Sequence, residues 1–273
     1  MSAVDVAPPE PPGWERVLAA QAHVGFVEPD VDARVALGDL VARMSRACAR
    51  GVLPRRLVSD ARALQLSVVE EDGVVWLSDG PDAVRGTGLL ALRLGDLPEA
   101  LILQAPHPFD DARTGEIALL MFDAASIRGV MVATAERDLH PGSDPAHAEE
   151  STFNAMTLAL AESLRDPLFV QLHGFAATTS EADAIVSPGA ARWPGDFTSV
   201  VDALSIGLSV VDVRSGADVP KLAGRTNVQG RILADEASFL HLELSRPVRE
   251  GLYADPSRAA ALADALIGVA EAR

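Results

Sequence analysis

Apolar residues recur along the first part of this chain at helix-like spacing. The pattern runs from Trp14 to about Leu66, is most regular in VDARVALGDLVARMSRACA, and is interrupted at Pro54. It predicts a helical N-terminal extension over residues 14–73. Residues 1–13 hold four prolines and few large apolar groups, which favours a flexible, proline-rich tail.

From about residue 74 onward, short apolar runs alternate with helical ones. VVWLSD, GLLALRLG and ALILQA predict three strands for which antiparallel pairing is plausible. Beyond them we expect the strands GVMVATA, LFVQLHGF, ADAIVSP, LSVVDV and SFLHLELS, and the helices TGEIALLMFDAA, ESTFNAMTLALAESL, DFTSVVDALSIG and PSRAAALADALIGVAEA. Such alternation is typical of a largely parallel sheet with helices on both faces. The sequence therefore predicts a mixed α/β domain over residues 74–273.

Three of these predicted strands carry side chains that can bind a metal or transfer a proton. His107 follows ALILQA, His173 lies near the end of LFVQLHGF, and Glu243 lies in SFLHLELS. Active sites of open α/β sheets lie outside the carboxyl ends of the strands, so we expect these side chains to meet there. Catalytic zinc usually takes three histidine or carboxylate ligands. We therefore predict His107 and His173 as the nitrogen ligands of a zinc ion.

The third ligand is expected among the carboxylates that follow His107, namely Asp110, Asp111 and Glu116. We favour Asp111, because it comes four residues after His107, just past the strand. From there its carboxylate can turn back to the same ion.

Period-two alternation divides the last predicted strand into two faces. It places the leucines 240, 242 and 244 on one face, and His241 and Glu243 on the other. On a covered sheet such a carboxylate points into a cleft, where desolvation raises its pKa toward that of a useful general base. We assign that role to Glu243.

Hydrolysis of an amide also needs a positive group for the developing oxyanion or for a substrate carboxylate. Arg231 is our first candidate, because it closes the polar segment before the last strand, and Arg137 is our second. Arg225 and Asn227, in the same segment as Arg231, are candidate substrate-binding residues, and so is His147 in SDPAHAEESTF.

The net charge of the chain limits the kinds of molecule that it is expected to bind. The formal net charge of −16 opposes binding to nucleic acid or to an anionic membrane, since both require a positive surface. The N-terminus does not resemble a secretory signal and no apolar run is long enough for a membrane span, so a cytoplasmic location is expected. The expected partner is a small-molecule or peptide substrate, and a homo-oligomer is compatible with the sequence.

Several motifs together resemble a known group of enzymes. QAPHPFDDARTGEIA, SDPAHAEESTF, VQLHGF, TNVQGR and FLHLELSRPVREGLY are similar to motifs of bacterial zinc hydrolases related to N-formylglutamate amidohydrolases and to zinc carboxypeptidases of the M14 type. The resemblance covers about residues 75–255. It implies a carboxypeptidase-like fold, with zinc as the cofactor.

The resemblance also implies roles for single residues. His107 and His173 would be zinc ligands, with Asp111 in place of the glutamate of the His-x-x-Glu motif. Glu243 would match the catalytic glutamate, and Arg231 an arginine that orients substrate or stabilises the oxyanion. Position 110, three residues after His107, is also aspartate, so Asp110 stays an alternative ligand. Tyr253, the only tyrosine, has no clear counterpart, so specificity for a C-terminal residue is not implied.

The function implied is that of a zinc-dependent hydrolase that cleaves an amide or peptide bond in a small acyl-amino-acid or peptide. Zinc would acidify a bound water, Glu243 would take its proton, and Arg231 would stabilise the oxyanion. Two alternatives stay open. One is a non-catalytic binding or regulatory protein on the same fold. The other is a metal-dependent esterase or biosynthetic enzyme.

Overall fold

The computed structural model describes residues 25–80, 85–98, 100–210, 212–234 and 237–273. The predicted tail, residues 1–13, lies outside these ranges, as do residues 14–24 of the predicted extension. Among the described residues, no helix is both long enough and apolar enough to cross a membrane.

The described part of the chain forms one nine-stranded sheet in the order β1-β2-β3-β5-β4-β6-β9-β7-β8. The four central strands run parallel: β5 (Gly129–Val132), β4 (Leu101–Ala105), β6 (Leu168–Phe175) and β9 (Ser238–Ser245). Antiparallel pairs flank this centre on both sides, through β3 (Leu89–Arg93), β2 (Val74–Asp79) and β1 (Leu66–Glu71), and through β7 (Ala184–Ser187), which also pairs with β8 (Val213–Ser215).

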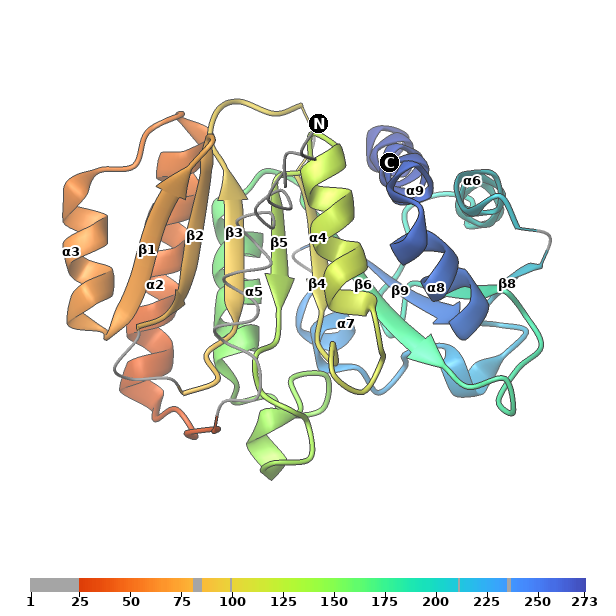
Figure 1. The fold of residues 1–273 in the computed structure, drawn as a ribbon, viewed down its shortest axis with the longest axis horizontal. Helices are drawn as coiled ribbons and strands as arrows, with labels where there is room; N and C mark the ends of the chain where they lie inside the picture. The colour runs from red at the N-terminus through yellow and green to blue at the C-terminus, as the bar shows by residue number, and fades with distance from the viewer. Residues whose placement is uncertain (1–24, 81–84, 99, 211, 235–236) are drawn as a thin grey trace, which may run out of the picture.

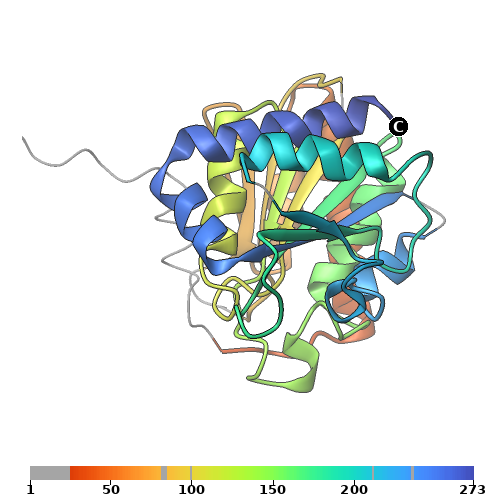
Figure 2. The ribbon, with the colours of Figure 1, turned by 90° about the vertical axis from the view of Figure 1, so that its right-hand side faces the viewer.

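Helices cover both faces of the sheet (Figure 1). One face carries α4 (Thr114–Ala124), α6 (Thr198–Leu208), α8 (Arg246–Ala254) and α9 (Pro256–Glu271). In Figure 2, α6 and α9 lie side by side across this face. The opposite face carries α2 (Val31–Ala49), α3 (Arg55–Ala63), α5 (Thr152–Ser163) and the short α7 (Val228–Ile232). The predicted mixed, largely parallel sheet flanked by helices, with a helical N-terminal region, is confirmed.

Each face of the sheet has its own apolar core, because successive side chains of a strand point to opposite faces. In β9, the leucines 240, 242 and 244 pack into the core beneath α4, α8 and α9, whereas Phe239 packs into the core beneath α2 and α5. His241 and Glu243 follow Phe239 on that second face, as the alternation predicted. On this face of β9 the apolar core ends at Phe239. The next side chains on the same face, toward the carboxyl end of the strand, are polar.

Local sequence signals set the ends of several helices. Ser151 caps α5, and its side chain accepts a hydrogen bond from the backbone N–H of Asn154. The Asp30 side chain caps α2 in the same way, and Asp255 with Pro256 begins α9. These caps satisfy backbone donors that have no partner inside their helix.

The structure differs from the sequence prediction in several elements. The strand β5 lies between β3 and β4, so the third predicted strand pairs in parallel with β5 and β6 and not antiparallel with β3. The segment predicted as a polar loop contains α7, and α8 was not predicted at all. In addition, β1 falls within residues 14–73 and forms the edge of the sheet. The division of the chain at residue 73 stays a prediction.

Candidate active site

A cavity of about 320 Å³ opens beside the carboxyl ends of β4, β6 and β9. It is lined by most of the residues that the sequence singled out, together with several that it did not: His107, Asp111, Arg137, Ala146, His147, His173, Gly174, Pro220, Lys221, Gly224, Arg225, Thr226, Asn227, His241 and Glu243. This is the edge of the sheet at which open α/β folds bind their ligands.

The parallel register of β6 and β9 sets the floor of the cavity. His173 lies opposite Glu243, and Gln171 lies opposite His241. His107 follows β4, and the backbone N–H of Asp111 donates to the carbonyl of His107 across 2.8 Å. That turn carries the Asp111 carboxylate back toward the strand ends, as the four-residue spacing predicted.

Asp111 lies between two imidazoles. Its Oδ2 is 3.1 Å from Nδ1 of His173 and 3.6 Å from Nδ1 of His107. All three residues are buried, with at most 9% of their surface exposed. Burial raises the pKa of Asp111, but the two neighbouring imidazoles, which attract its negative charge when they are protonated, outweigh burial and hold that pKa well below its usual range. Asp111 is therefore a carboxylate at neutral pH.

His107 is held on its other side as well. Its Nε2 lies 2.9 Å from Oδ1 of Asp144, whose Oδ2 lies 3.0 Å from Nδ1 of His147. Burial raises the pKa of Asp144, but its hydrogen bond with His107 dominates and brings the value to about 2. For His107 itself, burial opposes the charge, yet the bonds with Asp111 and Asp144 raise the pKa to about 9. The site thus attracts positive charge.

This donor set fits a divalent cation. The ionised Asp144 carboxylate can only accept a hydrogen bond, so Nε2 of His107 must carry the hydrogen of the bond between them. In neutral His107, the other ring nitrogen, Nδ1, then has a lone pair that faces Asp111. Such a carboxylate–histidine pair is the usual outer partner of a metal-bound imidazole. Two imidazole nitrogens and one carboxylate oxygen that converge in this way match the ligand types that zinc takes.

Glu243 lies beside this set without a hydrogen-bond partner for its buried Oε2 among the described residues. Burial raises its pKa to about 8, and the negative charge of Asp111 acts in the same direction. Arg249 and His107 act against that rise. A buried carboxyl group with a free oxygen and a raised pKa has the properties of a general acid–base group.

His241 completes the floor of the cavity. Its ring stacks on that of His173, with the ring centres 4.5 Å apart, and its buried Nδ1 has no hydrogen-bond partner among the described residues. Burial lowers its pKa well below the usual value. The backbone of Gly224, at φ +60°, passes so close that a Cβ there would lie 2.5 Å from the imidazole.

The Arg249 side chain connects several backbone segments of the site. Its Nε donates to the carbonyl of Ala112 at 2.9 Å, and its Nη1 donates to the carbonyl of Leu244. A side chain at Gly174 would collide with the same guanidinium. Ala112, Leu244 and Gly174 directly follow Asp111, Glu243 and His173 in the sequence. The buried Arg249 side chain therefore contacts the backbone beside each of these three site residues.

The other candidates from the sequence fall into two groups. His147, Arg225 and Asn227 line the cavity, and so does Arg137, whose Nε lies 3.6 Å from Oδ1 of Asp110. Glu116 pairs with Arg113 instead. Arg231 is not among the residues that line the cavity; it is half-exposed on α7 and pairs with Glu149 at 2.7 Å.

Two further groups of side chains share histidines with the His107–Asp111–His173 set. One is formed by His107, Asp144 and His147, and the other by His173, His241 and Glu243. Asp144 and His241 were not singled out from the sequence. The spacing of Asp144, three residues before His147, and the position of His241, two before Glu243, are the signals that could have revealed them.

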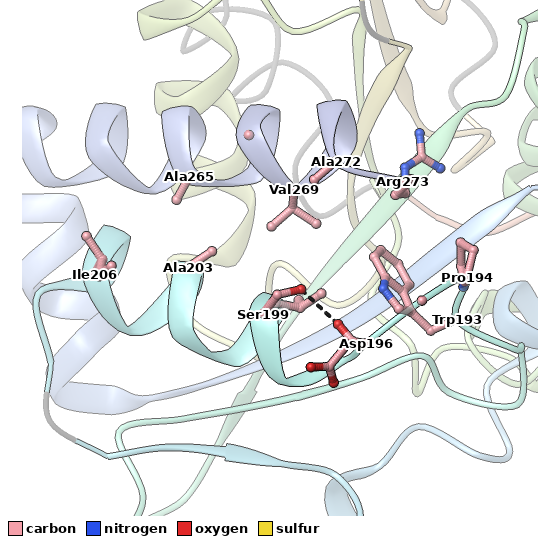
Figure 3. Close-up of a pocket in the computed structure, with 13 residues that line it drawn as sticks. Trp193, Pro194, Asp196, Ser199, Ala203, Ile206, Ala265, Val269, Ala272 and Arg273 are labelled. Carbon is pink, nitrogen blue, oxygen red and sulfur yellow. Dashed lines mark hydrogen bonds between the residues drawn. The ribbon is translucent and has the colours of Figure 1, made fainter.

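A second cavity, of about 370 Å³, lies between α6 and α9 (Figure 3). Its walls are mostly apolar or small, with Trp193, Val200 and Val269 among them. Asp196 and Arg273 are the charged residues that line it, and no imidazole does. The chemistry-bearing side chains therefore gather in the first cavity.

Fold and site together define a class: an open α/β sheet with a histidine–aspartate–histidine set at the carboxyl ends of its central strands. No protein-family model matches the chain, and no curated protein matches it either. Among solved structures, the chain is similar to an N-formylglutamate amidohydrolase from Ralstonia eutropha JMP134, with 12% identity, a TM-score of 0.41, and 64% of this chain and 94% of that one covered.

Two other similar structures are hydrolases by description. A succinylglutamate desuccinylase from Chromobacterium violaceum shares 14% identity, with a TM-score of 0.45 and coverage of 87% of this chain and 73% of that one. A bacteriophage poly-gamma-glutamate hydrolase shares 14% identity, with a TM-score of 0.39 and coverage of 64% and 86%. N-formylglutamate amidohydrolases are one of the two groups that the motifs of this chain resemble. Because fold does not fix function, activity has to be inferred from the cavity itself.

Proposed function

We propose that this protein is a metal-dependent hydrolase, with zinc as the first choice of metal, that cleaves an amide bond in a small acylated amino acid or peptide. One observation carries the proposal: a buried carboxylate between two imidazole nitrogens lies beside a second carboxyl group with a free, buried oxygen. The first group fits a metal ion, and the second fits a general base.

His107, Asp111 and His173 would hold the ion, and Asp144 would orient His107 from outside. A bound zinc ion supplies Lewis-acid chemistry, which makes a water molecule more acidic and polarises a carbonyl group. Asp111 is preferred to Asp110 as the carboxylate ligand, because Asp110 is exposed and lies beside Arg137.

Glu243 would accept a proton from the attacking water and return it to the leaving amine. Its raised pKa of about 8 keeps it protonated in the metal-free chain at neutral pH. A divalent ion at the His107–Asp111–His173 set would carry more positive charge than protonated His107 does, and that charge would favour the carboxylate form, because opposite charges nearby lower the pKa of an acid. Glu243 is therefore expected to become a competent base only when the site carries that charge.

Cations at the rim of the cavity would bind the substrate. Lys221 and Arg225 are exposed there and Arg137 is half-buried, although the chain as a whole is strongly acidic. In this proposal Arg137 and Arg225 take the role in binding and oxyanion stabilisation that the resemblance implied for Arg231, which lies outside the cavity. Asn227 and His147 are the polar groups beside them.

The test is hydrolysis of a panel of N-acyl amino acids and short peptides by protein of measured zinc content. We expect Glu243→Gln to lower kcat by at least about 100-fold while the zinc content is unchanged, since it removes the base and retains the shape. The control is Glu149→Gln, which changes an exposed carboxylate outside the cavity. Full activity of Glu243→Gln would contradict the assignment, and chelator-insensitive hydrolysis would contradict the metal.

A second comparison tests the arginines. Arg137→Gln should raise KM or lower kcat by about tenfold or more, because it removes a charge from the cavity wall. Arg231→Gln should leave both constants within about twofold, because exposed ion pairs contribute little. If the two variants behaved in the opposite way, Arg231 and not Arg137 would serve the substrate.

A further inference from the structure

Gln171 lies beneath the cavity and makes no contact with its open space. It stands two residues before His173 on β6, on the same face of the strand, and is fully buried. Its Oε1 lies 2.8 Å from Nε2 of His173, the nitrogen that faces away from Asp111. The same oxygen accepts a hydrogen bond from Nδ2 of Asn227.

The amide group of Gln171 is locked by two other glutamines. Its Nε2 donates to Oε1 of Gln104 at 3.1 Å and to Oε1 of Gln229 at 3.0 Å. Gln104 in turn donates to the hydroxyl of Thr157 at 2.8 Å. All of these side chains are fully buried, so water does not compete for their hydrogen bonds.

Backbone carbonyl groups fix the direction of every bond in this network. The amide nitrogen of Gln229 donates to the carbonyl of Pro145 at 2.7 Å, and the amide nitrogen of Asn154 donates to the carbonyl of Ala148 at 2.6 Å. A carbonyl oxygen can only accept, so these two nitrogens cannot be exchanged with their oxygens. Gln229 must therefore present its oxygen to Gln171, and Gln171 must present its own oxygen to His173.

The consequence for His173 follows from the donor and acceptor inventory. The oxygen of Gln171 has no hydrogen to give, so Nε2 of His173 carries the hydrogen of their bond. A neutral imidazole has only one N–H, so Nδ1 is left with a lone pair directed at Asp111. This is the ring nitrogen that a metal between His173 and Asp111 would require.

We propose that Gln171 is a positioning residue that holds His173 in the tautomer with its hydrogen on Nε2, and thereby presents Nδ1 to the metal ion. The tautomer follows from the hydrogen bonds alone, whereas its use in metal binding rests on the proposed function. The network ends on the segment between Asp144 and Glu149, which also carries His147. Gln171 therefore links the orientation of His173 to the segment that holds His107 from the other side.

The test begins with ¹⁵N NMR of the six histidines in the full, metal-free chain, with single histidine substitutions for assignment. At a pH at which the ring is neutral, His173 should show its directly bonded hydrogen on Nε2. A hydrogen on Nδ1 would overturn the proposal without the need for any variant.

The variant is Gln171→Met, which keeps the length of the side chain and removes the acceptor. We expect the His173 hydrogen to move to Nδ1, where it can donate to Asp111, and we expect zinc affinity in a chelator competition to fall about 10- to 100-fold. The matched control is Gln104→Met, which removes a buried amide of the same network that does not touch His173. In Gln104→Met the tautomer of His173 should be unchanged, and the zinc affinity should stay within about threefold of that of the unsubstituted chain.

The outcomes separate this proposal from the proposed function. If Gln171→Met kept the hydrogen on Nε2 and bound zinc as tightly as Gln104→Met, Gln171 would have no positioning role. If the unsubstituted chain had the Nε2 hydrogen but bound no zinc, the metal-dependent function would fail, while Gln171 would still set the tautomer. Should Gln171→Met not fold, the spectrum of the unsubstituted chain still decides the tautomer.

Discussion

At the scale of single residues, the pKa values of His107 and Glu243 describe a site that binds protons when it lacks a metal. His107 has a pKa of about 9 because Asp111 and Asp144 outweigh the effect of burial, and Glu243 has a pKa of about 8 mainly because it is buried. A metal ligand must be a neutral imidazole or a carboxylate. Metal binding and proton release should therefore be coupled.

We predict that zinc binding at pH 7 releases at least about one proton, the one on His107. The measurement is titration calorimetry in buffers of different ionisation enthalpy. Asp144→Asn removes a charge that raises the pKa of His107, so the variant should release fewer protons and bind zinc more weakly. His147→Gln, a change on the exposed side of Asp144, is the control and should release the same number. No proton release from the unsubstituted chain would contradict the pKa assigned to His107.

Residues near strand ends could be predicted from the sequence, because the carboxyl ends of parallel strands lie along one edge of the sheet, where open α/β folds bind their ligands. His107, Asp111, His173 and Glu243 were found in this way, and they lie together. Asp144 and Arg249 were missed, because they reach the site from segments whose position depends on the whole fold. Arg231 was misplaced, because the unpredicted helix α7 carries it to the exposed surface.

At the scale of elements, the site depends on how α8 is attached to the sheet. Arg249 of α8 bonds the carbonyl groups of Ala112 and Leu244, one beside Asp111 and the other beside Glu243. The side chain is buried, and burial lowers its pKa. Loss of this side chain would remove the donor to the buried carbonyl of Leu244 and to the partly buried carbonyl of Ala112.

We predict that Arg249→Met lowers the free energy of unfolding by about 2–5 kcal/mol, because it removes the donor to the buried Leu244 carbonyl and a positive charge near Asp111 and Glu243. Arg246→Met on the same helix is the control. Arg246 is mostly exposed and pairs with Glu250 at 3.8 Å, so its loss should cost less than about 0.5 kcal/mol. Urea unfolding of both variants measures the difference, and equal costs would rule out a special role for Arg249.

Element type was predictable wherever the apolar period was long or regular, as in α2, α5, α9 and the central strands. The order of the strands was not, because β5 pairs with both β3 and β4, although α4 separates it from β4 in the sequence. Such pairing is decided by packing between distant segments. The helices α7 and α8 span only five and nine residues, which is too short for the apolar period to be followed over several turns.

At the scale of the whole molecule, raised pKa values make the stability of the metal-free chain depend on pH. Between its ordinary pKa of 4.5 and its folded value of about 8, Glu243 keeps a proton in the folded state that the unfolded chain has lost. Stability must fall with rising pH wherever the folded state binds more protons. The contribution of this group is therefore fully present below pH 4.5 and is lost as the pH rises toward 8.

We expect the free energy of unfolding of the metal-free chain to fall between pH 5.5 and pH 8, by up to about 1.4 kcal/mol per pH unit from Glu243 alone. In Glu243→Gln this slope should be shallower, since the variant has no carboxyl group to ionise. Glu149→Gln, which alters an exposed carboxylate, should keep the original slope. Urea titrations in the presence of a chelator measure all three, and parallel slopes would refute the buried, protonated state of Glu243.

The most direct test of the metal site is anomalous diffraction at the zinc edge from crystals of the zinc-loaded protein. We predict one strong peak in the cavity, about 2.0–2.2 Å from Nδ1 of His107, Nδ1 of His173 and a carboxylate oxygen of Asp111. No peak there, or a peak held instead by Asp144 and His147 or by His241 and Glu243, would contradict the assignment.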